Sequence, residues 1–301
     1  MKSGFVSFVG RPNAGKSTLV NYLVGSKLAI VSDKPQTTRT CILGVRNYPD
    51  AQVVLVDTPG IHRPLHRMNV RMVDAALEAT HDVDVVGLVV DVTDPPGNGD
   101  RFVLDLMTRV QAPVFLVLNK IDLIRRPRLL PVIDRYRQTK QFAEIIPVSA
   151  ATGENVDRLE QLIIDTLPEG ERIYPDDYLT DQPERFLAAE TVREKVLQFT
   201  HAEIPFSSAV VVDRFEEPNG ERPLLRLFCT IVVDRESQKP IVIGKGGEMI
   251  KRIGSAARAD LERLFSCRVF LDLRVSVSAD WREDERVLRD IGLGGSGCVR
   301  R

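Results

Sequence analysis

Near its start the chain reads Gly10-Arg11-Pro12-Asn13-Ala14-Gly15-Lys16-Ser17, directly after the short apolar run Phe5–Val9. This stretch matches the pattern G-x-x-x-x-G-K-[ST], which arises by chance about once in a hundred chains of this length. Its glycines let the backbone close around phosphate oxygens, while Lys16 adds a positive charge and Ser17 is placed to bind magnesium. The apolar run and the motif together predict a strand, then a phosphate-binding loop, then a helix. We include Thr18, the next residue, among the nucleotide-binding residues.

The composition is that of a globular protein with about two domains. The 301 residues are 43% hydrophobic, which is ample for packed cores. The net charge of −1 gives no overall attraction to nucleic acid, so any basic surface must be local. The cysteines lack C-x-x-C spacing, which argues against a zinc site or a disulfide framework and favours a reducing cytoplasm. They are Cys41, Cys229, Cys267 and Cys298.

No secretory signal or membrane span is expected. The first residues lead straight into a strand pattern, without a charged region, a long apolar stretch and a cleavage site. The longest apolar run, Val83–Val92, contains Asp84 and Asp91 and is too short to cross a bilayer. We interpret it as a buried parallel strand.

Strand-like apolar runs alternate with helical stretches through the first half of the chain. This alternation predicts an α/β domain, a mostly parallel six-stranded sheet with helices on both faces. The short connection Tyr48-Pro49-Asp50 predicts an antiparallel hairpin between the second and third strands. The expected strands are Phe5–Val9, Cys41–Asn47, Gln52–Asp57, Val83–Asp91, Val114–Asn119 and Ile145–Ser149.

Polar motifs follow three of these strands, at the sheet edge where such folds bind ligands. After the third strand comes Asp57-Thr58-Pro59-Gly60, whose carboxylate suits magnesium and whose last amide can meet a γ-phosphate. After the fifth comes Asn119-Lys120-Ile121-Asp122, whose carboxylate can accept hydrogen bonds that guanine offers and adenine does not. Ser149-Ala150 follows the sixth strand and could turn an amide toward the guanine oxygen. Together the motifs predict a guanine-nucleotide site.

With its motifs in this order, the chain resembles translation-factor-like GTPases of the P-loop class. The resemblance implies that Gln36-Thr37-Thr38-Arg39 belongs to the first switch, with Thr38, or failing that Thr37, as a magnesium ligand. It also implies catalysis by charge stabilisation and in-line attack of water, without a covalent intermediate. Lys16, Thr38 and Gly60 are the implied catalytic groups.

Ile61 stands directly after Gly60, where Ras-like GTPases carry a water-orienting glutamine. Its side chain cannot perform that task. Related GTPases with a hydrophobic residue here are thought to use a backbone-positioned water, and several hold K⁺ with a P-loop asparagine. Asn13 occupies the matching position and is a candidate K⁺ ligand, with a simple loop-capping role as the alternative.

The second half has a different order of elements. An irregular linker over residues 169–182 follows the first domain at 1–168, and a second domain covers residues 183–290. We expect it to contain a helix, a two-stranded hairpin around Pro218-Asn219-Gly220, a glycine loop, a second long helix and a last strand. The helix and strand ranges are Glu184–Phe199, Ser208–Phe215, Leu224–Val233, a helix to about Phe265, and Val269–Val277. Residues 291–301 are expected to be a flexible tail.

The glycine loop Gly244-Lys245-Gly246-Gly247 carries a second functional pattern. A bare G-x-x-G is uninformative, and a basic cluster alone is more often a solvated helix face. Here an apolar run precedes the loop, a helix leaves it, and the basic residues Lys251, Arg252 and Arg258 follow. This arrangement resembles the nucleic-acid clamp of KH domains, and the element order resembles their type II form.

Taken over nearly the whole chain, these motifs resemble Era-type bacterial GTPases. The resemblance also rests on Pro183–Phe186, Val192–Lys195, Glu203–Pro205 and the stretch from Arg235 to Gly254. It implies a GTPase using GTP, GDP and Mg²⁺ that binds the 3′ region of small-subunit ribosomal RNA and assists 30S assembly. It further implies a cytoplasmic monomer that does not bind DNA, with weak peripheral association at the inner membrane. The alternative is a GTP-dependent adaptor that docks to protein or membrane partners, in which the glycine loop serves only structure.

Overall fold

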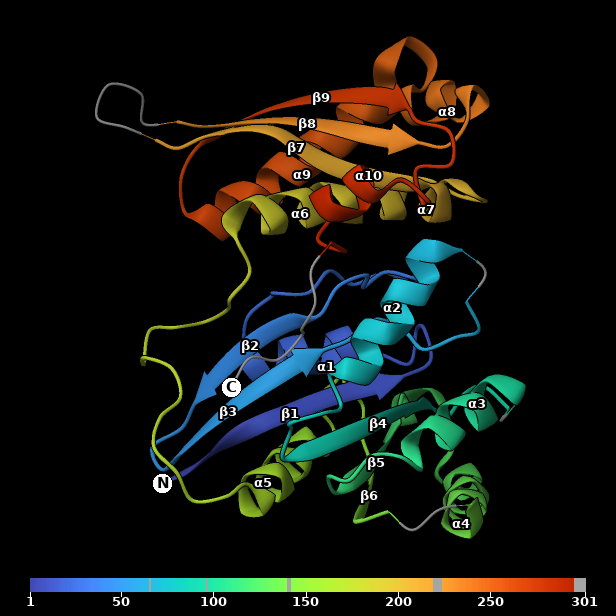
Figure 1. Cartoon of the computed structure of the whole chain (residues 1–301), viewed down its shortest axis with the longest axis vertical. Helices are drawn as coiled ribbons and strands as arrows, with labels where there is room; N and C mark the ends of the chain where they lie inside the picture. The colour runs from blue at the N-terminus through green and yellow to red at the C-terminus, as the bar shows by residue number, and fades with distance from the viewer. Residues whose placement is uncertain (65, 96, 140–141, 219–223, 295–301) are drawn as a thin grey trace.

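The structure, a computed structural model, describes residues 1–64, 66–95, 97–139, 142–218 and 224–294. It contains a six-stranded sheet in the order β2-β3-β1-β4-β5-β6 and a three-stranded sheet in the order β7-β8-β9. Figure 1 shows the two sheets in separate halves of the molecule, with α6 and α10 of the second half facing α2 of the first. The predicted fold class, an α/β domain followed by an α+β domain, is confirmed.

In the first half, every neighbouring pair of strands is parallel except β2 and β3, which form the predicted antiparallel hairpin. The strands are β1 Lys2–Gly10, β2 Ile42–Asn47, β3 Ala51–Asp57, β4 Val85–Asp91, β5 Val114–Asn119 and β6 Glu144–Pro147. The helices are α1 Lys16–Val24, α2 Arg67–Glu78, α3 Asn98–Met107, α4 Leu129–Thr139 and α5 Val156–Thr166, with short 3₁₀ turns η1 Ile121–Leu123 and η2 Arg126–Arg128.

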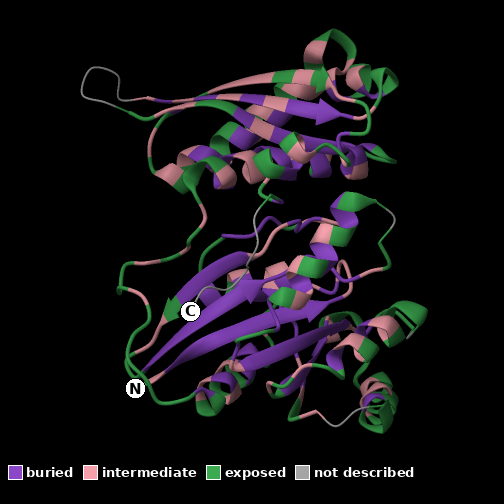
Figure 2. Ribbon diagram, in the orientation of Figure 1, coloured by how far each residue is buried: buried purple, intermediate pink, exposed green. Residues whose placement is uncertain are grey.

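Both faces of this sheet are buried, which explains why its strands are nearly continuous apolar runs. Along β1, Val6 and Phe8 point into a core closed by α1 and α5. Their neighbours Phe5 and Val9 point into the opposite core, to which α2, α3 and α4 contribute. Figure 2 shows the resulting buried strands between half-exposed helices. The carboxyl ends of the parallel strands are left to carry the polar motifs.

The second half contains the predicted order of helix, two strands, two helices and strand, with the short helices α7 before β7 and α10 after β9 in addition. Strands β7 Ser208–Glu216 and β8 Leu225–Val233 are antiparallel, and β9 Val269–Val277 runs parallel to β8. The predicted hairpin turn includes Asn219 and Gly220, which lie outside the described residues. The helices are α6 Glu184–Phe199, α7 Ile204–Ser207, α8 Lys239–Ile243, α9 Glu248–Phe265 and α10 Glu285–Asp290, with 3₁₀ turns η3 Glu236–Gln238 and η4 Lys245–Gly247.

The connecting segment runs beside the edge strand β2. The amide of Val45 donates to the carbonyl of Leu179 at 2.9 Å, and the hydroxyl of Thr180 donates to the carbonyl of Leu43 at 2.6 Å. These bonds cover part of an edge that would otherwise expose unpaired backbone groups. Among the described residues, none of the helices combines the length and apolar character that a membrane span requires.

A small apolar cluster joins the two halves. Met68 and Met72 of α2 pack with Trp281, which is fully buried and donates its indole N–H to the carbonyl of Ser207 at 2.9 Å. Trp281 therefore packs at the contact between the two halves. Of the predicted tail, Leu293 is buried in the same cluster, and residues 295–301 lie outside the described part.

The cysteines differ from expectation at one position. Cys229 and Cys267 are free thiols, whereas Cys41 is disulfide-bonded. The sequence argued against a disulfide framework and did not predict this single bonded cysteine. Spacing along the chain could not show this, because a disulfide needs only that two Cβ atoms meet in the fold.

Candidate nucleotide-binding site

The loop between β1 and α1 is closed tightly around its two glycines. Gly10 ends β1 with φ +150°, and Gly15 precedes α1 with φ +93°. A Cβ atom on Gly10 would lie 2.3 Å from the carbonyl oxygen of Val89, and one on Gly15 would lie 2.1 Å from Nδ2 of Asn119. Neither position has room for a side chain. Glycine at both positions lets the loop close tightly, and its backbone amides stay open to a ligand held inside the loop.

Lys16 is held inside this loop. Its side chain is buried, and Nζ donates to the carbonyl oxygens of Gly10 and Arg11 at 3.2 and 3.0 Å. Burial lowers the pKa of Lys16 to about 8, although the nearby Asp57 carboxylate opposes the shift. A phosphate group in the loop would therefore meet a lysine that burial has already stripped of water.

Three predicted magnesium ligands converge from three segments. Oγ of Ser17 lies 2.7 Å from Oδ2 of Asp57 and 2.7 Å from Oγ1 of Thr38, and Thr38 donates to the same carboxylate oxygen at 3.2 Å. The hydroxyl of Thr37 instead donates to the carbonyl of Lys34 at 2.5 Å. The structure therefore brings Thr38, and not Thr37, to Ser17 and Asp57.

The cluster suits a magnesium ion that is shared with a ligand. Burial raises the pKa of Asp57 despite Lys16, Ser17 and Thr38, and its Oδ1 is buried without a hydrogen-bond partner. Within the described part of the chain, no group of three or more His, Cys, Asp or Glu could hold a metal. Mg²⁺ commonly binds one or two protein groups and takes its remaining oxygens from phosphates and water. The donors present fit that pattern.

The segment after β3 is fixed against the phosphate loop. The hydroxyl of Thr58 donates to the carbonyl of Phe8 at 2.7 Å, and the amide of Ile61 donates to the carbonyl of Gly10 at 3.0 Å. A Cβ atom on Gly60 would lie 2.7 Å from the Pro12 backbone. Ile61 itself is buried in the apolar core, so its side chain does not face the site. Pro59 lies between Thr58 and Gly60 in a segment without regular secondary structure.

A cavity of about 310 Å³ lies over these groups, within the usual range for small-molecule sites. The phosphate loop forms one wall and the segment from Ile30 to Thr38 forms the other. Asn13 joins the two walls, since its Nδ2 donates to the carbonyl of Asp33 at 2.7 Å. Gly60 and Lys120 complete the lining.

The predicted base-recognition residues lie around Asn119. Its Nδ2 donates to the carbonyl of Ala14 at 2.8 Å, and its Oδ1 accepts from the amide of Ala150 at 2.9 Å. It thus links the phosphate loop to the Ser149-Ala150 loop. Asp122 lies on the exposed turn η1, where its carboxylate is open to solvent.

Asp91 is a residue of this site that sequence reasoning missed. It ends β4 directly opposite Asn119 of β5, and its Oδ2 lies 2.5 Å from Nζ of Lys120. Burial acts to raise the pKa of Asp91, but hydrogen bonds from Lys120 and Thr93 outweigh it and hold the pKa below its ordinary value. Its place at the carboxyl end of a predicted parallel strand was the available signal.

The second glycine loop lies far along the chain, between α8 and α9, and is open. Gly244, Gly246 and Gly247 all have positive φ. A Cβ atom on Gly246 or Gly247 would meet nothing within 4 Å. The basic residues predicted around this loop lie at the surface, and the guanidinium of Arg252 lies 4.2 Å from the ring centre of Phe199. They are Lys245, Lys251, Arg252 and Arg258.

Comparison with known proteins agrees with this geometry. Residues 5–120 match a family described as 50S ribosome-binding GTPase, and residues 203–282 match the KH domain family. GTPase Era of Geobacter metallireducens is 50% identical over 291 residues, which is 97% of each chain. GTPase Era of Syntrophus aciditrophicus is 51% identical over 97% of this chain and 95% of its own. The chain belongs to the Era family of GTPases.

Solved Era structures resemble the chain along its whole length. A crystal structure of Era with MgGDPNP and nucleotides 1506–1542 of 16S ribosomal RNA has a TM-score of 0.94 at 41% identity, covering 97% of this chain and 99% of that one. A single-residue variant of Aquifex aeolicus Era bound to GDP and AlF₄⁻ gives 0.93 at 40%, with the same coverage. Scores this high over both halves mean that the halves are arranged here as in those two Era structures.

Proposed function

We propose that this chain hydrolyses GTP at the cavity described above and uses its KH half to bind the 3′ region of small-subunit ribosomal RNA during 30S assembly. The observation that carries the proposal is the convergence of Ser17, Thr38 and Asp57 beside buried Lys16. Oxygen atoms from three segments far apart in sequence meet there within hydrogen-bond distance of one another, and their donor types suit Mg²⁺. The Era structure with MgGDPNP and 16S ribosomal RNA supports both parts.

Each residue of the phosphate side has a defined task. Lys16 exchanges the carbonyl oxygens of Gly10 and Arg11 for phosphate oxygens, and the loop amides and the N-terminus of α1 face the same charge. Ser17 and Thr38 would hold magnesium beside Asp57, where the ion would neutralise charge on the β- and γ-phosphates. The amide of Gly60 would donate to the γ-phosphate. Because Ile61 is buried, its side chain would not orient the attacking water, and we assign that role to backbone groups.

On the base side, Asp122 accepts from the guanine ring N–H and its exocyclic amine. Asn119 keeps the phosphate loop and the Ser149-Ala150 loop in register. Lys120, paired with Asp91, lines the same cavity as the phosphate loop and would pack against the bound nucleotide. The exposed Asp122 carboxylate is hydrated before the nucleotide binds. Guanine replaces this water with two hydrogen-bond donors, whereas adenine does not offer them in that arrangement and would leave the carboxylate unpaired.

The KH half binds the RNA backbone through its open glycine loop. Gly246 and Gly247 leave space for a phosphate to approach the chain, and Lys245 and Lys251 neutralise its charge. Arg252 and Arg258 extend the basic surface along α9. The domain limits 1–168, 169–182 and 183–290 with a tail at 291–301 belong to this proposal, as do a monomeric state and no binding of DNA.

The location follows from the proposed RNA partner. A protein that acts on the small ribosomal subunit works in the cytoplasm, and the weak peripheral association with the inner membrane implied by the family is part of the same proposal. Asn13 is proposed as a K⁺ ligand on the basis of its place in the phosphate loop.

The experiment separates the RNA-binding enzyme from a GTP-dependent adaptor. Lys245→Glu with Lys251→Glu should weaken binding of a 3′ small-subunit RNA fragment by at least roughly tenfold, with GTP turnover unchanged. The charge-matched control is Arg135→Glu with Arg137→Glu, two exposed positions on α4. Equal RNA binding by both double variants and the wild type would support the adaptor.

The guanine assignment has its own test. Asp122→Asn replaces an acceptor-only group with one that also donates, so the preference for GTP over ATP should fall by about tenfold or more. Competition binding of the four nucleoside triphosphates measures it. An unchanged preference for GTP would remove Asp122 from the base site.

A further inference from the structure

The segment that carries Thr38 has no regular secondary structure. Residues 31–40 form neither helix nor strand, yet Thr38 must reach Ser17 and Asp57 within hydrogen-bond distance. A segment of this kind needs contacts from elsewhere to keep a fixed shape. Two consecutive residues of α6, Arg193 and Glu194, supply such contacts from the other half of the molecule.

Arg193 holds the carbonyl next to Thr38. Its side chain is only 2% exposed, and its Nη2 donates to the carbonyl oxygen of Thr37. Glu190, one turn earlier on α6, accepts from Nε at 2.7 Å and from Nη2 at 2.6 Å. This two-point contact fixes the plane of the guanidinium, so Nη2 can point in only one direction. The carbonyl that it holds is separated from the Thr38 side chain by a single peptide unit.

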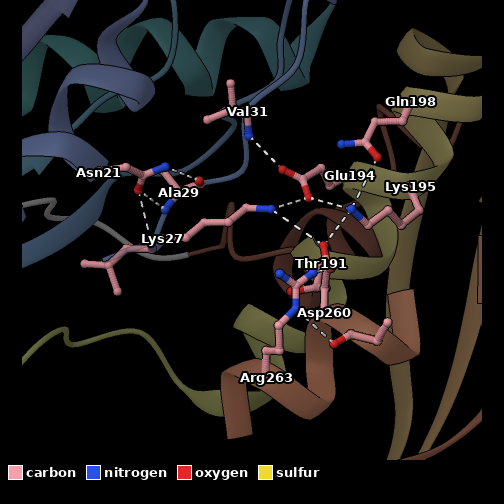
Figure 3. A network of polar contacts seen from close by, with 12 residues as sticks. Asn21, Lys27, Ala29, Val31, Thr191, Glu194, Lys195, Gln198, Asp260 and Arg263 are labelled. Carbon is pink, nitrogen blue, oxygen red and sulfur yellow. Dashed lines mark hydrogen bonds and ion pairs between the residues drawn. The ribbon is translucent and has the colours of Figure 1, made fainter. Parts of the chain in front are cut away.

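Glu194 holds the other end of the same segment. One carboxylate oxygen accepts from the amide of Val31 at 3.0 Å, and the other lies 2.6 Å from Nζ of Lys27. Figure 3 shows Glu194 between these groups and Lys195, which pairs with Asp260 of α9 at 2.6 Å. The segment is thus held at Val31 and at Thr37 by one rigid helix of the KH half.

We propose that Arg193 is a positioning residue for GTP hydrolysis, which acts through the Thr37 carbonyl to keep the Thr38 hydroxyl at the magnesium site. The inference rests on the proposed GTPase function. The whole-chain TM-score of 0.94 to Era with MgGDPNP and 16S ribosomal RNA indicates that the two halves are arranged in a similar way there. The KH half thereby contributes to a magnesium site that lies wholly within the other half.

The test uses full-length protein and Mg²⁺ as the variable. Arg193→Ala removes the donor to Thr37, so the Mg²⁺ concentration at half-maximal single-turnover GTP hydrolysis should rise by roughly fivefold or more. GDP affinity measured without Mg²⁺ should stay within about twofold, because the phosphate loop and base site are untouched. Arg193→Lys keeps one donor and should lie between the wild type and the alanine variant.

The matched control is Arg185→Ala on the same helix. Arg185 also donates to a backbone carbonyl, that of Val212, but this carbonyl lies on β7 of the KH half. The Mg²⁺ concentration at half-maximal GTP hydrolysis by Arg185→Ala should equal that of the wild type. The inference is overturned if the wild type hydrolyses GTP and Arg193→Ala needs no more Mg²⁺ for half-maximal hydrolysis than Arg185→Ala does. If the wild type shows no hydrolysis, the proposed function itself fails.

Arg193→Lys also guards against a merely structural effect. A loss of folding in Arg193→Ala would lower GDP affinity and the melting temperature together, and the lysine variant then carries the test. Partial recovery of Mg²⁺ dependence by Arg193→Lys, at unchanged GDP affinity, supports positioning. A lysine variant with wild-type stability and no shift in Mg²⁺ dependence contradicts it.

Discussion

Two glycine loops precede helices in this protein, and they differ in what surrounds them. Gly15 precedes α1 with φ +93°, and Gly247 precedes α9 with φ +82°. A Cβ atom on Gly15 would collide with Asn119, whereas one on Gly247 would meet nothing within 4 Å. The backbone conformation is similar, but the first loop is enclosed by its own domain and the second is open to solvent.

The lysines of the two loops differ in the same way. Lys16 is buried and bonded to loop carbonyls, while Lys245 lies at the surface. An enclosed loop with a desolvated charge suits a small ligand whose phosphates are fully surrounded. An open loop with solvated charges suits one phosphate of a long backbone that passes over it. The same local geometry therefore serves two classes of ligand, and the surroundings decide which.

The largest effect is expected where an added methyl group fills the enclosed loop. Gly15→Ala places a Cβ atom 2.1 Å from Asn119 Nδ2 in a left-handed backbone. Nucleotide affinity should fall by roughly a hundredfold or more, and unfolding free energy by about 2–4 kcal/mol. Titration with a fluorescent GDP analogue and chemical denaturation measure the two quantities.

Gly25→Ala is the control at the other end of α1. Gly25 also has positive φ, but its Cβ atom would meet only the flexible end of Arg46 at 3.1 Å. It should lower stability by about 1 kcal/mol and leave nucleotide affinity nearly unchanged. Similar affinities for the two alanine variants would mean that the first loop is not enclosed in the way described.

The buried lysine predicts a pH dependence that the open loop should lack. Lys16 has a pKa of about 8 without ligand, and bound phosphates raise it. Below pH 8 both states are protonated, so affinity is flat. Above pH 8 binding must take up a proton, so GDP affinity should fall by about tenfold between pH 7 and pH 9.

Isothermal titration with GDP at pH 7, 8 and 9 measures this slope, and Lys16→Arg provides the control. Arginine stays charged across this range, so the variant should show a flat profile at lower overall affinity. If the GDP affinity of the wild type is as independent of pH as that of the arginine variant, a pKa of about 8 for Lys16 is contradicted.

Residues at the enclosed loop were predictable from sequence because parallel strands bring their carboxyl ends to one edge. Ser17, Asp57, Asn119 and the open glycine loop follow from that rule or from local motifs. Asp91 obeys the same rule but belongs to no familiar motif, so it was passed over. The preference for Thr38 over Thr37 came only from the family resemblance, since both carry the same hydroxyl, and the coordinates bring Thr38 to Ser17 and Asp57.

Contacts between the halves were beyond sequence reasoning. Arg193 and Glu194 stand in an ordinary-looking helical stretch, and their partners Thr37 and Val31 lie more than 150 positions earlier. No periodicity relates residues across such a distance. The burial of the Arg193 guanidinium depends on how the two domains meet, which a charge in a helix pattern does not reveal.

A smaller effect is expected in the open loop. Gly246 has φ +60° and no neighbour for a Cβ atom, so Gly246→Ala should cost only about 1 kcal/mol of stability. RNA affinity should fall by about fivefold, because the methyl group stands where the RNA backbone approaches. Filter binding with the 3′ small-subunit RNA fragment measures it.

Gly254→Ala is its control, on α9 two turns beyond the loop. A Cβ atom there would make an ordinary 3.4 Å contact with Leu273 in helical backbone. It should leave RNA binding unchanged and raise stability slightly, since alanine favours a helix over glycine. If Gly246→Ala binds RNA as well as Gly254→Ala does, the open loop is not the contact.

The smallest effect concerns the monovalent cation, to which only the enclosed loop should respond. If Asn13 supplies a K⁺ ligand beside the phosphates, GTP hydrolysis should be about threefold faster in K⁺ than in Na⁺ at equal ionic strength. RNA binding by the open loop depends on ionic strength alone, so it should be equal in the two salts. Asn13→Ala should abolish the difference in turnover, although it also removes the bond to the Asp33 carbonyl. Equal wild-type turnover in the two salts would leave Asn13 only the role of joining the phosphate loop to the segment that carries Thr38.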